Sequence, residues 1–122
     1  MKGNTMKAIF QKDDSIIDFI PKEDHDAGEW VIFEDIVGIT SRKVRTGRIS
    51  GLQTRGCFKN VEKHATGNAL VAGQKVYLNP ADKKVYGTKA AGYIHCGFAL
   101  KDAEATAKTC EIMLVNSGEI AE

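Results

Sequence analysis

Short runs of apolar residues recur along this chain, and each run is bounded by turn-forming residues such as Gly, Pro, Asn and Asp. Side chains alternate between two faces along a strand, whereas a helix places its apolar residues at a period of 3.6. The runs are too short and too broken for long amphipathic helices. The pattern therefore predicts an all-β fold, a β-barrel or a β-sandwich, with short or no helices.

The clearest local signal is a β-hairpin near the middle of the chain. Residues 75–79 and 84–88 are rich in β-branched and aromatic side chains, and they flank the sequence Asn79-Pro80-Ala81-Asp82. Proline presets the backbone angle at the second position of a turn, and Asn79 and Asp82 can accept hydrogen bonds from nearby backbone amides. We expect two antiparallel strands joined at this turn.

Further strands are predicted on both sides of the hairpin. The runs that favour them are short and rich in β-forming side chains. They cover residues 7–11, 15–20, 30–33, 36–40 and 110–115, with one more strand after a turn at Gly47. The polar segment 101–109 lacks a large apolar residue that could dock a helix, so we expect a loop with one helical turn.

The run at residues 93–100 is predicted to be a buried strand. Strand periodicity places Ile94, Cys96, Phe98 and Leu100 on one face. Gly97 interrupts the run, and a glycine inside a strand marks a close approach of another backbone or a bulge.

The chain of 122 residues has the length of one domain, and folding hides roughly two-thirds of the surface of such a chain. We expect a single domain over residues 1–122, with residues 1–6 as a flexible N-terminal arm and 117–122 as a frayed tail. Trp30, the only tryptophan, is either a core residue or an interface anchor, and the apolar run around it favours the core.

Charge is almost balanced, with 17 Lys and Arg against 16 Asp and Glu and a net charge of +1. This balance argues against a protein whose main role is to bind nucleic acid. The basic residues at 42–48 would be divided between two faces if this segment were a strand. No apolar run is long enough for a membrane span or a signal peptide, so we expect a protein made in the cytoplasm that stays soluble.

The residues that carry catalytic chemistry are scattered along the chain. The cysteines (Cys57, Cys96 and Cys110) show no Cys-x-x-Cys spacing, and we expect reduced, buried side chains. The acidic residues at 23–26 fit no calcium loop and are read as a solvated turn. The glycines at 51 and 56 are followed by Cys57 and Phe58 where a phosphate-binding loop needs Lys and Ser or Thr. We therefore predict no catalytic residue, no cofactor and no metal.

The order of several short motifs nevertheless resembles the capsid cement, or head decoration, proteins of tailed phages. The similarity extends over about residues 7–115. Its most characteristic part lies around the central hairpin and the strand that follows it. The matching motifs are the residues 14–19, Gly28, 36–39, 51–58, 73–78, 84–86, 96–99 and 111–115. Relatives of this family have also been labelled as phage recombinases resembling RecA, but the missing phosphate-binding loop gives that label no physical support here.

The resemblance implies a small β-rich, β-tulip-like structural protein without enzymatic activity. It implies binding to the outer surface of an expanded phage head, with the major capsid protein as the partner, no nucleic acid or membrane partner, and self-association into a homotrimer. We expect the N-terminal arm to bind the capsid by adding a strand to a capsid protein edge, through Lys2, Met6, Lys7 and Phe10. Two alternatives stay open: a β-barrel ligand-binding accessory module of prophage origin, and an enzyme whose pocket gathers His or carboxylate side chains.

Overall fold

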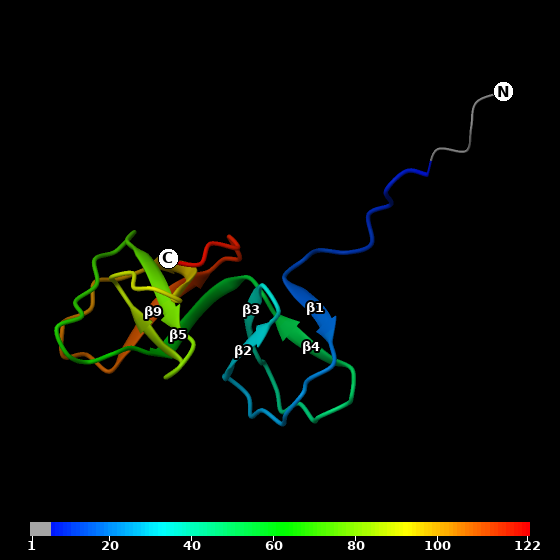
Figure 1. Ribbon diagram of the computed structural model, residues 1–122, viewed down its shortest axis with the longest axis horizontal. Coiled ribbons are helices and arrows are strands. Elements are labelled where there is room, and N and C mark those ends of the chain that lie inside the picture. Colours follow the sequence, from blue (N-terminus) through cyan, green and yellow to red (C-terminus); the bar gives the residue numbers. More distant parts are fainter. Residues whose placement is uncertain (1–5) are drawn as a thin grey trace.

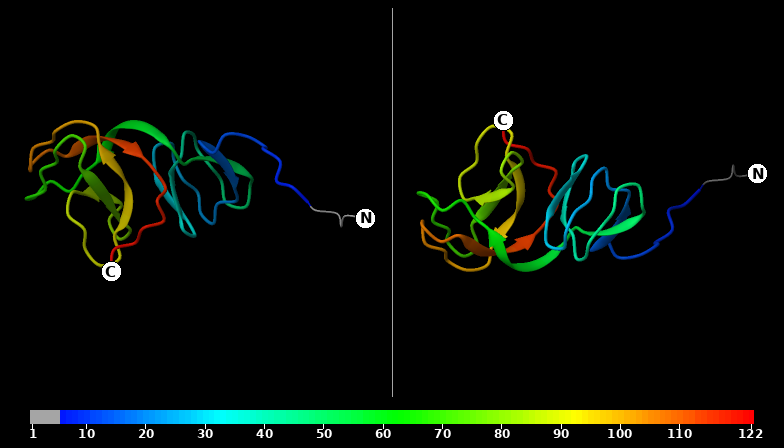
Figure 2. Two further views of the ribbon diagram at one scale, coloured as in Figure 1. Left: turned by 90° about the horizontal axis from the view of Figure 1, so that it is seen from above. Right: turned by 90° about the horizontal axis from the view of Figure 1, so that it is seen from below.

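A computed structural model describes residues 6–122 and consists of two antiparallel β-sheets in two adjacent lobes (Figure 1). This range contains no helix, and therefore none that is long and apolar enough to cross a membrane. The views in Figure 2 show the two lobes side by side, with the N-terminal segment projecting from one end. The predicted all-β class is confirmed.

The N-terminal lobe contains a four-stranded sheet with the order β1-β4-β3-β2, and the C-terminal lobe a five-stranded sheet with the order β5-β9-β8-β6-β7. The strands of the first sheet are β1 (Ile16–Phe19), β2 (Trp30–Phe33), β3 (Ile36–Ile39) and β4 (Ser50–Gln53). Those of the second are β5 (Gly56–Glu62), β6 (Lys75–Asn79), β7 (Lys84–Tyr86), β8 (Ile94–Ala99) and β9 (Thr109–Leu114).

The arrangement is a sandwich-like pair of sheets, and within residues 6–122 neither sheet closes into a barrel. The C-terminal sheet comes nearest to closure, because Lys63 just beyond β5 forms one isolated parallel bridge with Val85 of β7. A single bridge does not make a ladder of paired strands, so the edges of this sheet remain distinct. Of the two architectures expected from the sequence, the sandwich is therefore the observed one.

The predicted central hairpin is confirmed in β6 and β7. The side-chain oxygen Oδ1 of Asn79 accepts a hydrogen bond from the amide of Ala81 at 2.9 Å, and Oδ1 of Asp82 accepts one from the amide of Lys84 at 2.9 Å. Lys83 has a positive φ of 58°, which lets the chain reverse direction between these bonds.

Most of the other predicted strands are also present, as β1, β2, β3, β4, β8 and β9. Two segments differ from expectation. Residues 7–11 form no strand, because they extend away from the lobes and have no neighbouring strand to pair with (Figure 1). Residues 101–109 form a loop without the expected helical turn, and Ala103 instead pairs with Leu70 in an isolated bridge.

Two apolar clusters form the interior, and the N-terminal sheet contributes to both. One face of that sheet packs Phe19, Val31 and Leu52 against Val44 from the loop that follows β3. The opposite face supplies Trp30 and other side chains of β2 and β3 to the core of the C-terminal lobe. Trp30 is 7% exposed, which confirms its assignment to the core.

A bulge in β8 changes the predicted burial pattern. Val76 of β6 lies opposite Gly97, but the next residue, Tyr77, lies opposite His95, so Cys96 is the extra residue on β8. As a result both His95 and Cys96 are buried, whereas Leu100, predicted to share the buried face, is 40% exposed. The sequence predicted a bulge or a close backbone approach at Gly97. The structure shows both, with the bulge at the adjacent Cys96 and the backbone of Met113 packed against Gly97.

The C-terminal segment 117–122, expected to fray, is hydrogen-bonded to the start of β8. The amide of His95 donates to the carbonyl of Glu119 at 2.9 Å, and Tyr93 and Gly92 exchange backbone hydrogen bonds with Ala121 at 2.8 Å. Ala121 is 8% exposed. The segment is held because it satisfies backbone groups of residues 92–95, a partner that its own sequence does not indicate.

We predict that Gly97→Ala lowers the free energy of unfolding by at least about 2 kcal/mol, because overpacking forces the backbone to move. A Cβ at this position would lie 2.0 Å from the carbonyl oxygen of Met113 in β9. Gly51→Ala is the matched control in a strand, since its nearest contact would be the flexible end of Ile16 at 3.2 Å. Urea unfolding measures both variants, and an equal small loss for the two would contradict the prediction.

Candidate functional site

The residues with catalytic potential do not converge in the structure. Among residues 6–122, no group of three His, Cys, Asp or Glu side chains is placed to hold a metal ion. His95 lies 2.9 Å from Oγ of Ser117 through Nδ1 and 3.1 Å from the carbonyl oxygen of Gly97 through Nε2. Its ring also packs against Tyr77 and Phe98. His95 is therefore a core histidine with both ring nitrogens satisfied.

The cysteines are divided between the interior and the surface. Cys96 and Cys110 are buried, whereas Cys57 is exposed, so the expectation of buried thiols holds for two of the three. Burial raises the pKa of the Cys96 thiol to about 12 and that of the Cys110 thiol to about 11. A protonated thiol is a poor nucleophile, so these two side chains act as small apolar residues of the core.

Lys63 is a buried residue that the sequence interpretation missed. Its ammonium donates to the carbonyl oxygens of Asn68 at 2.6 Å, His64 at 2.9 Å and Ala105 at 3.4 Å. Desolvation lowers the pKa of Lys63. The only sequence signal for its burial is its spacing of two residues from the buried Val61 on the same strand line. Because its donors reach three loop carbonyls, Lys63 joins the loop that follows β5 to the loop between β8 and β9.

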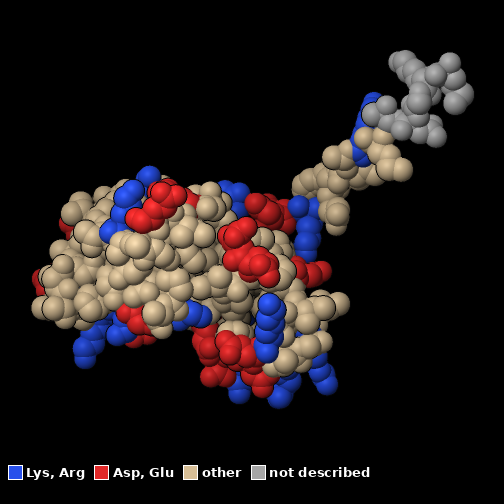
Figure 3. Space-filling model, viewed as in Figure 1, with Lys and Arg blue, Asp and Glu red and all other residues tan. Residues whose placement is uncertain are grey.

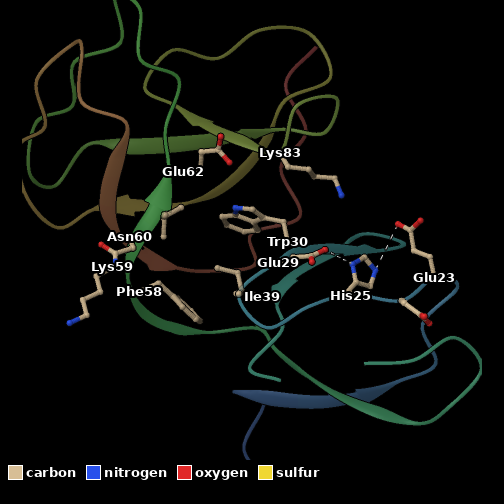
Figure 4. Close-up of a pocket in the computed structure, with 13 residues that line it drawn as sticks. Glu23, His25, Glu29, Trp30, Ile39, Phe58, Lys59, Asn60, Glu62 and Lys83 are labelled. Atoms are coloured by element: carbon tan, nitrogen blue, oxygen red, sulfur yellow. Dashed lines mark hydrogen bonds and ion pairs between the residues drawn. The ribbon is translucent and has the colours of Figure 1, made fainter. Parts of the chain in front are cut away.

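A groove of about 650 Å³ lies between the two lobes (Figure 4). Trp30 and Ile39 from the N-terminal sheet and Phe58 from β5 form its apolar wall, with Glu62 and Lys83 among the charged residues that line it. The groove is an open hollow lined by both apolar and charged side chains, which suits contact with a protein better than enclosure of a small molecule.

The acidic turn, residues 23–29, borders this groove and is held by internal hydrogen bonds. Oδ1 of Asp24 accepts from the amide of Thr46 at 2.8 Å, and this bond is the main cause of a lowered pKa for the Asp24 carboxyl. Glu29 accepts from the amide of Asp26 at 2.7 Å, which lowers the Glu29 pKa in the same way. His25 lies 3.3 Å from the Glu29 carboxylate. The turn is therefore stabilised by hydrogen bonds within itself and by the bond to Thr46 in the loop 41–48.

The side chain of Asn116 joins the two lobes. Nδ2 of Asn116 donates to the carbonyl oxygens of Val37 at 3.0 Å and Thr54 at 2.6 Å, and Oδ1 accepts from the amide of Val37 at 2.8 Å. Asn116 follows β9, whereas Val37 belongs to β3 and Thr54 to the link between β4 and β5. One amide group therefore fixes the C-terminal sheet to the N-terminal one.

The N-terminal arm is exposed where the structure describes it. Of the four residues predicted to bind the capsid, Lys2 lies outside the described residues, and Met6, Lys7 and Phe10 lie in an extended segment that joins no sheet. Met6 is 96% exposed and Phe10 is 76% exposed, and Ile9 between them is 86% exposed. The structure thus places three apolar side chains on a short segment without burying them.

The basic loop, residues 41–48, lies between β3 and β4. A strand here would have divided its cations between two faces, but the segment forms a loop whose one sheet-like contact is a bridge between Val44 and His25. The cations of this loop therefore line the same hollow: Arg42, Lys43, Arg45 and Arg48. Figure 3 shows Lys and Arg side chains along the lower edge of the N-terminal lobe.

Comparison with known proteins gives one match. The model of the family described as phage cement protein matches residues 10–114, which is most of the chain. No curated protein and no solved structure matches the chain.

We predict that Asn116→Ala lowers the free energy of unfolding by about 1–2 kcal/mol, because backbone groups of Val37 and Thr54 lose their partner. The only tryptophan, Trp30, lies at the joint, so its fluorescence should shift to longer wavelength as the joint loosens. Asn79→Ala is the control, because half-buried Asn79 at the end of β6 also makes side-chain hydrogen bonds, to Ala81 and Tyr93, but none of them crosses the joint. This variant should leave the tryptophan spectrum unchanged. An unchanged spectrum in Asn116→Ala would contradict the role of this side chain at the joint.

Proposed function

The chain belongs to the phage cement protein family, and we propose that it binds the outer surface of a tailed-phage head as a homotrimer and stabilises the expanded shell. A cement protein has a structural, non-enzymatic role at the capsid of the virion. The observation that carries the proposal is the family match over residues 10–114 of an all-β chain.

The physical requirements of this role agree with the described surface. A structural clamp needs a complementary surface and no reactive group, and the described residues include exposed apolar side chains for such contacts, among them Met6 and Phe10. A trimer that touches several capsid subunits gains an effective-concentration advantage of order 10²–10⁴ over one weak contact. One head-to-tail interface repeated by rotation suffices to close such a ring of three.

For the N-terminal arm we propose addition of a strand to the edge of a capsid protein sheet. Lys2, Met6, Lys7 and Phe10 are the residues that would make this contact. An extended segment that belongs to no sheet has backbone groups available for a new strand partner, and its alternate side chains can enter pockets of that partner. The exposure of Met6 and Phe10 supports this proposal, since binding would remove both apolar side chains from water.

The first prediction concerns the choice between head forms. We expect the protein to co-sediment with expanded heads and not with compact procapsids, because the clamp fits the lattice spacing of the expanded shell. Analytical ultracentrifugation of the free protein gives its mass in the same buffer. A ligand-binding module would ignore both head forms, and that outcome would reject the cement function.

The second prediction concerns the arm. Deletion of residues 2–8, or the double substitution Met6→Ser with Phe10→Ser, should weaken binding to expanded heads at least about tenfold, since ordering of the arm and burial of its apolar side chains are lost. Val71→Ser is the matched control, because Val71 is 63% exposed in the C-terminal lobe. Unchanged head binding after the deletion would show that the arm is not a capsid contact.

A further inference from the structure

The basic groove is a hollow of about 490 Å³ on the N-terminal lobe, distinct from the groove between the lobes. It is lined by the basic loop, by the segment 48–51 that leads into β4, and by Ile16 at the start of β1. No internal packing requires so many cations at one place. Their concentration therefore points outward, to a partner.

The charge of the basic groove is only partly compensated. Within residues 6–122, none of the four side chains Arg42, Lys43, Arg45 and Arg48 forms an ion pair, and all four residues are exposed. Lys43 and Arg45 also line a neighbouring hollow that includes Asp24 and Glu29. Arg42 and Arg48 do not line that neighbouring hollow, so they are the cations most available to a ligand.

The groove also offers apolar surface beside its cations. Ile49 is 74% exposed and Ile16 is 47% exposed. A Cβ at Gly51 would lie only 3.2 Å from the Ile16 methyl group, so the glycine lets Ile16 pack closely against β4. A ligand that fits carries negative charge and at least one apolar side chain, which describes an acidic peptide segment better than a simple anion.

We propose that the basic groove binds an acidic, apolar-containing segment on the outer face of the major capsid protein. The proposal rests on the cement function and adds to it the chemistry of the contact. Ile16 is the first residue of β1, so the groove lies where the N-terminal arm joins the N-terminal lobe. The arm and the groove would therefore contact the capsid from the same lobe.

Two other occupants fit the groove less well. Single-stranded nucleic acid would call for aromatic side chains on which bases stack, and none lines this hollow. The net charge of only +1 argues against a duplex as the occupant. The acidic turn of a second copy offers carboxylates, but Asp24 and Glu29 already accept hydrogen bonds from Thr46 and Asp26. An acidic segment whose carboxylates are free is the better complement.

The test is the double variant Arg42→Glu with Arg48→Glu. Affinity for expanded heads should fall at least about tenfold, and the binding of the wild-type chain should weaken from 50 to 300 mM salt more steeply than that of the variant. Lys89→Glu with Lys108→Glu is the matched control, because it changes the net charge equally at exposed positions of the C-terminal lobe. Both variants should keep the wild-type melting temperature. Binding of the Arg42/Arg48 variant within twofold of the wild type would overturn the proposal.

A second measurement separates the groove from the cement function. A peptide of alternating Glu and Leu, titrated into the labelled protein, should shift the backbone amide resonances of residues 41–51, and the shifts should vanish in the Arg42/Arg48 variant. Wild-type protein that fails to bind heads but binds this peptide would reject the cement function and support the groove's preference for acidic segments. Tighter binding of a DNA oligonucleotide than of the peptide, or salt-sensitive dimerisation lost in the same variant, would overturn the capsid segment as the occupant.

Discussion

The joint between the two lobes is the constraint on which the rest of this structure depends. A four-stranded sheet with strands of four residues has little apolar surface of its own. The sheet gains apolar contacts because Trp30, Val37 and Ile39 pack into the core of the C-terminal lobe. Around β2 and β3 the N-terminal sheet is therefore buried on both faces. Asn116 adds hydrogen bonds in both directions across the same joint. The arm and the basic groove are consequently carried on a lobe whose position is fixed.

The interior contains Lys, His and Cys side chains, residue types that often act in catalysis. Here each of them is held by burial and hydrogen bonds. Lys63 donates to three carbonyl oxygens, His95 is hydrogen-bonded through both ring nitrogens, and burial keeps the Cys96 and Cys110 thiols protonated. Within residues 6–122 no buried side-chain nitrogen or oxygen lacks a hydrogen-bond partner. Such complete pairing favours a rigid fold over a reactive site, which agrees with a structural, non-enzymatic family.

The surface features that remain unsatisfied lie mainly on the N-terminal lobe. The arm exposes apolar side chains, and the basic groove exposes cations without carboxylate partners. Weak contacts of these two kinds complement one another, because apolar burial gives affinity while charge selects the partner and orients its approach. A clamp repeated over a symmetric shell needs no single strong contact, since several modest ones act together.

The sequence by itself determined most of the strands, though not β5. It also determined how the central hairpin turns, because a turn depends on neighbouring residues: Asn79 and Asp82 accept bonds from amides two residues away. The order of its motifs also indicated the family.

Features that depend on distant partners were decided by the tertiary structure. Residues 7–11 have strand propensity but no neighbouring strand, and the segment 117–122 gained a partner at the start of β8. The bulge at Cys96 arises from pairing with β6, and the basic groove exists because residues 41–48 form a loop and not a strand. Neighbouring residues determine the conformation of a turn. Pairing between distant segments determines which backbone groups are hydrogen-bonded and which charged side chains lie close together.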